Sequence, residues 1–501
     1  MSEELYPAVL RTPWGDLRRA EQRLSMSEQY DILRGRVTRR HFLRGAMAAG
    51  ATAVVAPTLW RQSAEAATVP ALSPHLSFGA DPRRQMVVSW ATPTRVKRAF
   101  LRFRRAGTRM WSERVATETR TVPGVTTTYH HARIGALRSG TTYEYVLGEP
   151  GGPKGVFRTA PSSPRAFRFT SFGDQGVSAN AAAVTAAVAG QRADFHFHVG
   201  DLCYAYRSGQ AEGFLPIPDD FRGPLLVSPG VWDEWLAQIK RVAARVPWMI
   251  AVGNHEMEPG YGVRGYEHSV LSRFTLPGTG ARVKGEPMAT YFFDYGNARF
   301  IALDANDANY EIPGNQGYLE GAQERWLEHT LADARRNARI DWIVVGYHQC
   351  SYCTNLLHAS DQGLRDRWDG LFEKYTVDLV VNGHNHSYER AHPKLAKTLG
   401  PLDMINPKEI NPAKDGTTFI TAGSGGNARV EESAHPLSYV TIEGGARVPE
   451  PAPWSVTRYL SHSFITVDVT PRVNGRTAMK IRAITPDGTE VDSVTLRRHK
   501  N

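Results

Sequence analysis

The stretch that decides the fold is Phe195-His-Phe-His-Val199, which runs directly into Gly200-Asp-Leu-Cys-Tyr-Ala205. A short, largely apolar run of this kind predicts a buried strand. The residues after it combine a glycine with a carboxylate and a phenol. Ligands of open α/β sheets bind outside the carboxyl ends of the strands. Residues 195–205 therefore predict a strand that ends at a functional site.

The same arrangement recurs four more times in the central part of the chain. Each further motif follows an apolar strand: Gly173-Asp-Gln-Gly176, Gly253-Asn-His-Glu256, Gly346-Tyr-His348 and Gly383-His-Asn-His-Ser-Tyr-Glu-Arg390. A glycine before each ligand lets the backbone turn sharply and approach closely. Each motif alone is weak, because Gly-Asp usually marks a turn and His-x-His occurs by chance. Five of them in order indicate one shared metal site.

Around these motifs, short apolar strands alternate with helical stretches, which predicts α/β layering. The expected strands are 167–172, 195–199, 248–252, 300–303, 342–345, 379–381 and 418–422. The expected helices are 181–189, 232–242, 323–336 and 364–375. The tail from about 457 to 501 returns to alternation, and we expect its strands to complete a sheet of the catalytic domain.

Residues 68 to about 160 have a different pattern, typical of an all-β sandwich. Alternating runs such as 85–90, 99–104 and 142–147 are separated by turn residues at short intervals. The segment Leu137–Tyr145 resembles a late-strand signature of fibronectin type III domains. Thr159–Pro164 reads as a linker. The expected domains are 1–67, 68–160 and 165–501.

Composition is that of a globular protein, with 41% hydrophobic residues and 60 Lys and Arg against 50 Asp and Glu. Of the net charge of +10, residues 1–66 contribute +3, and the remaining charge is expected to be spread over a large chain. Basic residues interleaved with aromatics are not evident, so nucleic-acid binding is not expected. The three cysteines are too few for a disulfide scaffold. Cys350 and Cys353 form either a disulfide or two ordinary thiols.

The N-terminal residues are typical of a targeting signal rather than of a folded domain. Thr38-Arg-Arg-His-Phe-Leu-Arg44 precedes an apolar run, Gly45–Leu59, that is shorter than the ~20 residues a spanning helix needs. Ala64-Glu-Ala66 then offers small residues for a signal peptidase. The pattern resembles a twin-arginine export signal. It implies the twin-arginine translocation machinery as a partner, no stable membrane span, and a final place in the periplasm, at the cell surface or in the medium.

The five motifs resemble those of the calcineurin-like metallophosphoesterases. Tyr204, three residues after Asp201, narrows the resemblance to the purple acid phosphatases, and the match covers about 165 to 430. It implies an α/β metallophosphoesterase fold, in which two β-sheets are flanked by helices. A fibronectin type III-like sandwich is expected to precede it.

By matched position, the resemblance implies a binuclear metal centre. One metal would be held by Asp174, Tyr204 and His386, the second by Asn254, His348 and His384, and Asp201 would bridge them. The anionic oxygen donors suit Fe(III), whereas the imidazoles and the amide suit a divalent ion such as zinc, iron or manganese. A tyrosinate on Fe(III) would give the purple colour of the family.

The implied reaction is hydrolysis of phosphate monoesters by attack of a metal-bound hydroxide. His255 would contact the phosphate or protonate the leaving group; the alternative is support of a ligand. His358 lies at about the offset of the substrate-contacting histidines of plant-type members; the alternative is a surface-loop histidine. Tyr388, Glu389 and Arg390 are expected to orient the strand of His384 and His386, and Cys203 to pack beneath Asp201.

The leading hypothesis is an exported acid phosphatase acting on small phosphate esters. A second is a phosphodiesterase or nucleotide phosphatase of the same superfamily. A third is a catalytically idle surface protein whose sandwich binds cell wall or a partner. Degraded ligand positions would favour the third hypothesis, but all seven are present.

Overall fold

The computed structural model describes residues 69–149, 151–205, 230–257, 268–284, 286, 289–310, 316–355, 358, 360–398, 407–427, 437–442 and 447–499. The predicted export signal lies outside these residues. Among the helices that the structure describes, none is long and apolar enough to cross a membrane.

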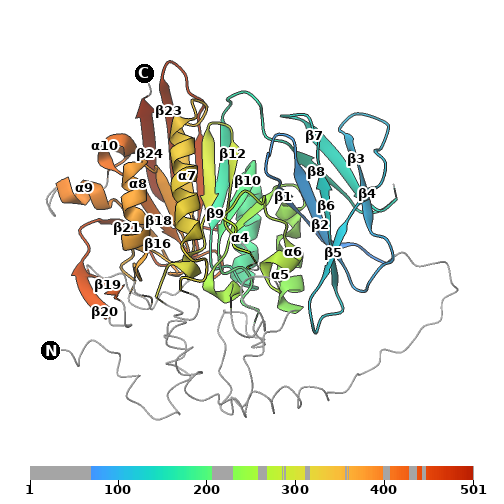
Figure 1. Ribbon diagram of the computed structural model, residues 1–501, viewed down its shortest axis with the longest axis horizontal. Helices are drawn as coiled ribbons and strands as arrows, with labels where there is room; N and C mark the ends of the chain where they lie inside the picture. The colour runs from blue at the N-terminus through green and yellow to red at the C-terminus, as the bar shows by residue number, and fades with distance from the viewer. Residues whose placement is uncertain are drawn as a thin grey trace, which may run out of the picture.

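Two four-stranded antiparallel sheets form the first part of the described chain (Figure 1). Their strand orders are β1-β2-β6-β5 and β4-β3-β7-β8. The strands are β1 (Leu72–Phe78), β2 (Met86–Thr92), β3 (Phe100–Arg105), β4 (Val115–Ala116), β5 (Glu118–Thr121), β6 (Thr128–Ile134), β7 (Thr142–Leu147) and β8 (Lys154–Arg158). Alternate residues of both sheets, among them Leu76, Trp90, Leu101 and Phe157, are buried in one core. The all-β sandwich expected from the sequence is present.

Two seven-stranded sheets form the rest of the molecule. The first has the order β11-β10-β9-β22-β23-β24-β17, and the second β12-β13-β14-β15-β18-β16-β21. The strands of the first are β9 (Phe167–Phe172), β10 (Phe195–Val199), β11 (Trp248–Ala251), β17 (Glu409–Ile410), β22 (Phe464–Val469), β23 (Arg476–Ile484) and β24 (Glu490–His499). Those of the second are β12 (Tyr291–Tyr295), β13 (Ala298–Ala302), β14 (Trp342–Gly346), β15 (Leu379–Asn382), β16 (Tyr388–Ala391), β18 (Thr418–Ala422) and β21 (Ser455–Tyr459). A small hairpin, β19 (Leu437–Thr441) and β20 (Arg447–Pro451), stands apart.

The two large sheets pack face to face through aromatic side chains. The ring centroids of Phe169 and Phe300, from opposite sheets, lie 5.0 Å apart in a T-shaped contact. Phe195 on the first sheet also contacts Phe293 on the second, at 5.4 Å. Edge-to-face contacts of this kind add to the free energy gained by burial. The alternating phenylalanines of β9 and β10 therefore hold the sheets together.

Helices cover the outer faces of both sheets. The longer ones are α4 (Ala179–Gly190), α5 (Gly230–Ala243) and α7 (Ala322–Arg336); the shorter ones are α6 (Val270–Arg273), α8 (Gly370–Lys374), α9 (Pro393–Thr398) and α10 (Pro412–Asp415). α4 and α5 pack on the first sheet, and α7 and α8 on the second. The predicted architecture, two sheets flanked by helices, is confirmed. The expected helix at 364–375 begins as a π-helix, Arg365–Asp369, where the buried Trp368 ring packs against Tyr347 at 4.8 Å.

Both sheets bring the carboxyl ends of parallel strands to a common edge. β9, β10 and β11 run parallel, as do β13, β14, β15 and β18. The N–H of Gly173, after β9, donates to the carbonyl of Ala422 at the end of β18, at 2.8 Å. The tail completes the first sheet, as expected, because β22 pairs antiparallel with β9.

The sandwich packs against the catalytic domain through polar contacts that include a buried histidine. His131 Nε2 lies 3.1 Å from the carbonyl oxygen of Ser272, and its Nδ1 lies 2.8 Å from Ser89 Oγ. Tyr129 donates its hydroxyl to Asp233 at 2.8 Å. The sheet β1-β2-β6-β5 therefore faces the catalytic domain, and the outer face of β4-β3-β7-β8 points away from it.

Candidate metal centre

Glycines allow the strand ends of the two sheets to touch. A Cβ atom on Gly253 would lie 2.1 Å from Asp201 Oδ1, and one on Gly383 would lie 2.6 Å from Asp174 Oδ2. Gly200, at φ +90°, leaves no room for a Cβ beside His348 Nδ1, 2.5 Å away. The close approach expected from the Gly-ligand pattern is therefore a requirement at these three positions.

Four of the predicted site residues have a left-handed backbone. The φ angles are 58° at Asp174, 50° at Asp201, 48° at Tyr204 and 66° at His384. Side-chain-bearing residues adopt this region at a cost, and such residues gather at active sites. The His384 bend also means that His384 and His386 converge from a loop rather than from an extended strand.

The first predicted ligand set converges around one phenol. Tyr204 Oη lies 3.1 Å from Asp174 Oδ1 and 3.2 Å from His386 Nε2. His386 Nε2 is also 3.4 Å from Asp174 Oδ1. All three side chains are buried, and together they present a carboxylate, a phenol and an imidazole to one point.

The second predicted ligand set gathers around Asp201. Asp201, His348 and His384 each offer a ligand atom within 4.8 Å of the others. His348 Nε2 lies 3.0 Å from Asp201 Oδ2 and 3.9 Å from Asp174 Oδ1, which links the two sets. His348 Nδ1 hydrogen-bonds the carbonyl of Val199 at 2.8 Å, which directs Nε2 toward the carboxylates.

Asn254 tests whether these residues fit a metal. It is fully buried, yet neither its Oδ1 nor its Nδ2 has a hydrogen-bond partner among the described residues. Buried amides nearly always form hydrogen bonds, because a buried amide without one has lost its hydrogen bonds to water and gained none in return. Asn254 lies between Gly253 and His255, which both contact Asp201, so its spare amide oxygen suits a cation beside that carboxylate. The residues present therefore fit a binuclear centre.

Glu256 and Asn306, which the sequence interpretation did not assign, fasten the ligand loops together. The Glu256 carboxylate accepts backbone N–H groups from Gly253, Asp201 and Leu202 at 2.8, 2.9 and 2.8 Å. Asn306 donates to the Gly253 carbonyl at 3.1 Å and accepts from Gln349, next to His348, at 3.1 Å. Glu256 could have been noticed as the last residue of the Gly253–Glu256 motif; Asn306 carries no sequence signal.

His255 and His358 both lie at the centre. The His255 N–H donates to Asp201 Oδ1 at 3.0 Å, its ring lies 4.5 Å from that of Tyr204, and its side chain is 13% exposed. The His358 ring packs at a tilt against that of His384, with centroids 4.2 Å apart, and His358 is only 7% exposed. A surface-loop position for His358 is therefore wrong, and His255 is the more open of the two.

Burial and neighbouring charges shift the pKa values of the site residues, often in opposite directions. Burial raises the pKa of Asp174 well above its usual range, with His348 acting against it. Burial lowers the pKa of His348, but Asp201 and Asp174 together raise it to about 10. Burial, Asp174 and Asp201 also raise the pKa of Tyr204 well above 10, while a hydrogen bond from Asn427 lowers it. Two carboxylates and a phenol this close together call for positive charge.

Other predicted residues act further from the centre. Tyr388 and Arg390 both donate to Asp492, at 2.7 and 2.6 Å, whereas Glu389 accepts the N–H of Thr354 at 2.9 Å. These three residues anchor β16 rather than the histidine rings. Cys203 is buried in the apolar core behind Asp201, as expected. Cys350 and Cys353 are free thiols, and Cys350 Sγ lies 2.9 Å from the carbonyl oxygen of Gly383.

The comparisons with known proteins agree with this geometry. Residues 168–388 match the calcineurin-like phosphoesterase family, and residues 71–170 match the purple acid phosphatase N-terminal domain. An uncharacterised protein of Mycobacterium tuberculosis is 33% identical over 92% of this chain and 96% of its own. Purple acid phosphatase 22 of Arabidopsis thaliana is 29% identical over 60% of this chain and 58% of its own.

The fold has a counterpart among solved structures. A purple acid phosphatase from yellow lupin seeds superposes with a TM-score of 0.63 at 21% identity, covering 86% of this chain and 75% of that one. An identity this low speaks for the fold alone. Together with the matched sequence families, it shows that the chain belongs to the purple acid phosphatase-like metallophosphoesterases, a family of phosphoric monoester hydrolases.

Proposed function

We propose that this chain is an exported binuclear-metal acid phosphatase that hydrolyses phosphate monoesters. The observation that carries the proposal is the phenol oxygen of Tyr204, 3.1 Å from Asp174 Oδ1 and 3.2 Å from His386 Nε2. A phenol placed among hard, buried donors suits Fe(III). The proposed domain organisation is an export signal at 1–67, a fibronectin type III-like sandwich at 68–160 and a catalytic domain at 165–501.

The proposed ligands divide as the motifs imply. Asp174, Tyr204 and His386 would hold Fe(III), and Asn254, His348 and His384 a divalent zinc, iron or manganese ion. Asp201, between the sets, would bridge them. When bound, such a pair supplies a water of lowered pKa and positive charge for the phosphoryl oxygens.

The remaining polar groups bind the substrate and move its proton. His255 is the most solvent-accessible of the predicted site side chains, and its backbone N–H is fixed by Asp201 Oδ1 at 3.0 Å. Its Nε2 would donate a proton to the oxygen of the leaving alcohol. His358, packed on His384, would contact a phosphoryl oxygen from the neighbouring side.

The test compares wild type, Tyr204→Phe and, as a matched control, Tyr459→Phe. The measurements are metal content, the visible spectrum and hydrolysis of p-nitrophenyl phosphate and of bis(p-nitrophenyl) phosphate. We expect about two metals per chain, a violet band that Tyr204→Phe alone bleaches, and preference for the monoester.

The other outcomes separate the alternatives. An active but colourless protein with two metals would remove Fe(III) and Tyr204 from the proposal. Preference for the diester would favour the phosphodiesterase alternative. Absence of metal and of hydrolysis after reconstitution with iron and zinc would leave a binding protein.

The proposed location rests on the twin-arginine pattern at Thr38–Arg44 and the small residues at Ala64–Ala66. Export would place the enzyme in the periplasm, at the cell surface or in the medium. Replacing both Arg39 and Arg40 by lysine should retain the protein inside the cell, which fractionation and immunoblotting would detect.

A further inference from the structure

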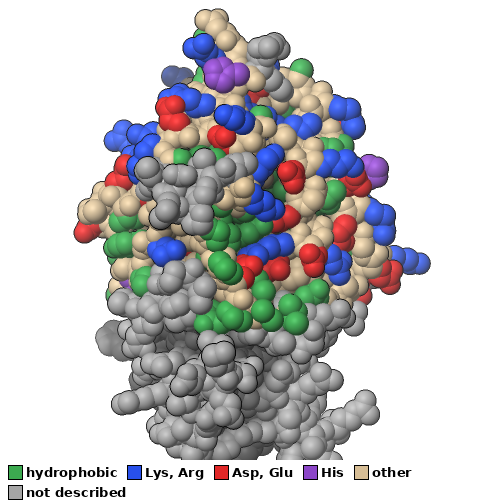
Figure 2. Space-filling model, turned by 90° about the vertical axis from the view of Figure 1, so that its left-hand side faces the viewer, with side chains coloured by type: hydrophobic (Ala, Val, Ile, Leu, Met, Phe, Trp, Pro, Cys, Tyr) green, Lys and Arg blue, Asp and Glu red, His purple; other side chains and the backbone are tan. Residues whose placement is uncertain are grey.

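The net positive charge of the chain is concentrated in the sandwich rather than spread along the sequence. Residues 69–160 hold 15 Lys and Arg against 5 Asp and Glu, whereas residues 161–501 hold 35 against 38. The expectation of a spread charge is therefore wrong. At the opposite end of the molecule, basic and acidic side chains are interspersed (Figure 2).

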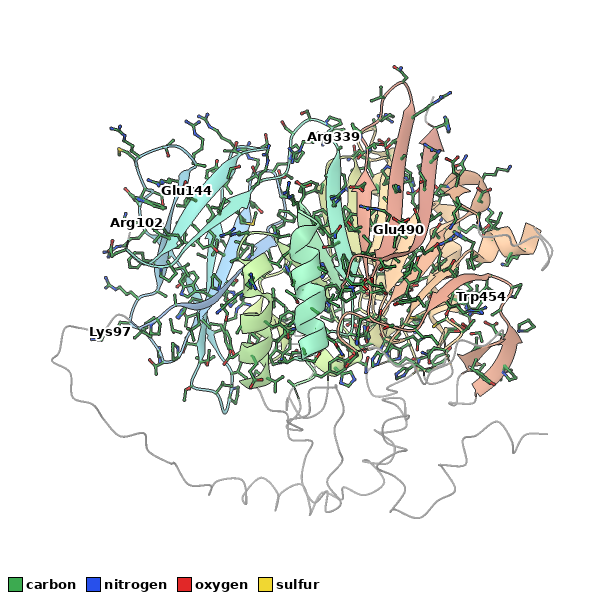
Figure 3. All side chains as sticks on the ribbon, turned by 180° about the vertical axis from the view of Figure 1, so that it is seen from behind. Lys97, Arg102, Glu144, Arg339, Trp454 and Glu490 are labelled. Carbon is green, nitrogen blue, oxygen red and sulfur yellow. The ribbon has the colours of Figure 1, made fainter. Side chains whose placement is uncertain are left out.

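Much of this charge lies on the outer face of the sheet β4-β3-β7-β8. The register places Arg102 beside Val146 and Lys154, and Arg104 beside Glu144 and Val156. We define the basic face as Arg102, Arg104, Arg109, Arg114, Lys154 and Arg158. Glu144 pairs with Arg104, and Glu149 with Arg102 and Arg114, so these eight residues carry a net charge of +4. Figure 3 shows Lys97, Arg102 and Glu144 at the outer end of the sandwich, away from the catalytic domain. The predicted metal ligands all follow strands of the two seven-stranded sheets, so this face is separate from the metal centre.

An exposed apolar tip sits within the basic face. Met110, in the loop between β3 and β4, is 84% exposed, the highest value among the large exposed hydrophobic side chains of the described chain. The loop is anchored: Arg102 donates to the carbonyl of Ser112 at 2.9 Å, and the Ser112 N–H donates to Phe103 at 2.8 Å. The Met110 side chain is therefore exposed to solvent on a loop that hydrogen bonds fix to β3.

The aromatic rings of this face are already covered. The Arg104 guanidinium lies 4.4 Å over the Trp111 ring, and that of Arg114 lies 4.4 Å over Phe100. Rings covered in this way are not available to stack against bases, which is how single-stranded nucleic acids are held. A soluble polyanion would also gain nothing from Met110. An apolar tip rimmed by cations suits an interface between water and an anionic lipid layer.

We infer that the basic face and the Met110 loop dock this enzyme on an anionic lipid surface. The cations would lie against the headgroups while Met110 enters the boundary with the acyl chains. Each Lys or Arg near such a surface strengthens binding by about fivefold. The inference is independent of the reaction proposed above.

The test is co-sedimentation of the full chain with phosphatidylcholine vesicles, with and without about one third phosphatidylglycerol. The variant R109E/R114E/K154E/R158E changes four exposed cations of the basic face; the matched control, R336E/R339E/K414E/R476E, changes as many exposed cations on the catalytic domain. We expect binding to anionic vesicles only. It should fall more than about a hundredfold in the first variant and stay within about threefold in the control.

A single substitution separates lipid from other polyanions. M110S should weaken vesicle binding about fivefold and leave binding to heparin unchanged. Equal loss in the two quadruple variants overturns the inference. So does unchanged vesicle binding of M110S, and so does binding to heparin without binding to vesicles. Melting temperature and hydrolysis of a soluble ester, unchanged in all variants, verify the fold.

Discussion

The carboxylate of Glu256 accepts the backbone N–H of Asp201 at 2.9 Å, across 55 residues of sequence. The same carboxylate oxygen accepts the N–H of Gly253 at 2.8 Å, and the other accepts that of Leu202. One side chain thus fixes the loops of Asp201 and Asn254 against each other.

Glu256→Gln should therefore damage the protein although it preserves the shape of the side chain. Gln can offer one acceptor oxygen, but its NH₂ group must face at least one backbone N–H, leaving a buried donor unpaired. Each hydrogen bond to a charged group contributes about 1.5–3 kcal/mol. We expect a free energy of unfolding lower by about 3 kcal/mol or more, with loss of bound metal, measured by denaturant titration and metal analysis.

The control for Glu256 is Glu234→Gln, on the exposed side of α5. It should leave stability and metal content unchanged. Normal metal content in Glu256→Gln would contradict the role assigned to this carboxylate.

Gly253→Ala should abolish activity although it adds only one methyl group. Its Cβ would lie 2.1 Å from Asp201 Oδ1 and 2.5 Å from the Asp201 nitrogen, so the Asp201 carboxylate must move. Gly370→Ala, where nothing lies within 4 Å of the new Cβ, is the matched control and should be neutral. Hydrolysis of p-nitrophenyl phosphate and metal content measure the difference; an active Gly253→Ala protein would show that the site tolerates displacement of Asp201.

The buried His131 makes the domain contact sensitive to acid. Burial, with Arg120 and His75 nearby, holds the pKa of His131 well below 6.5, so it stays neutral in the folded chain. The unfolded chain takes up this proton as the pH falls below about 6.5, so the free energy of unfolding declines there by at most about 1.4 kcal/mol per pH unit. His131→Gln should reduce this slope between pH 7 and 5 by the contribution of one histidine, because other buried histidines, such as His75 and His196, also have lowered pKa values.

Denaturant titrations at several pH values provide the measurement. His329→Gln, at an exposed position on α7, should keep the wild-type slope. If wild type and His131→Gln show the same slope, the acid sensitivity arises elsewhere.

Removal of metal should destabilise the protein as well as inactivate it. Asp174 and Asp201 are at most 2% exposed, and His348 Nε2 lies within 3.9 Å of both. A cation that binds only the folded chain stabilises it by about 4 kcal/mol at a free concentration a thousandfold above its Kd. Dialysis against a chelator should therefore lower the melting temperature, and re-addition of iron and zinc should restore it. An unchanged melting temperature would argue against a buried centre.

The strands were predictable because apolar runs bounded by glycines leave little choice. The expected strands at 167–172, 195–199 and 418–422 coincide with β9, β10 and β18. The pairing of β22 with β9 depends on contacts nearly 300 residues apart, and nothing local specifies it. The π-helical start at Arg365 also escaped prediction, because it follows from the packing of Trp368 on Tyr347.

The site was predictable as far as its residue types are distinctive. The carboxylates, phenol, amide and histidines stand directly after strands, and the structure brings them together. Glu256, Asn306 and Asn427 were not assigned, because Glu and Asn are common residues and most of their partners are far away in sequence. The left-handed backbone at Asp174, Asp201, Tyr204 and His384 had no sequence signal either, since only glycine usually indicates a positive φ angle.

The pairing of β22 with β9 sets the order of events during synthesis. Asp174 follows β9, whose second neighbour, β22 (Phe464–Val469), leaves the ribosome about 300 residues later. The sandwich can close while translation continues, since its strands pair only with one another. The metal pocket can form only after β22 has been made, so loading with metal follows the closure of the sandwich.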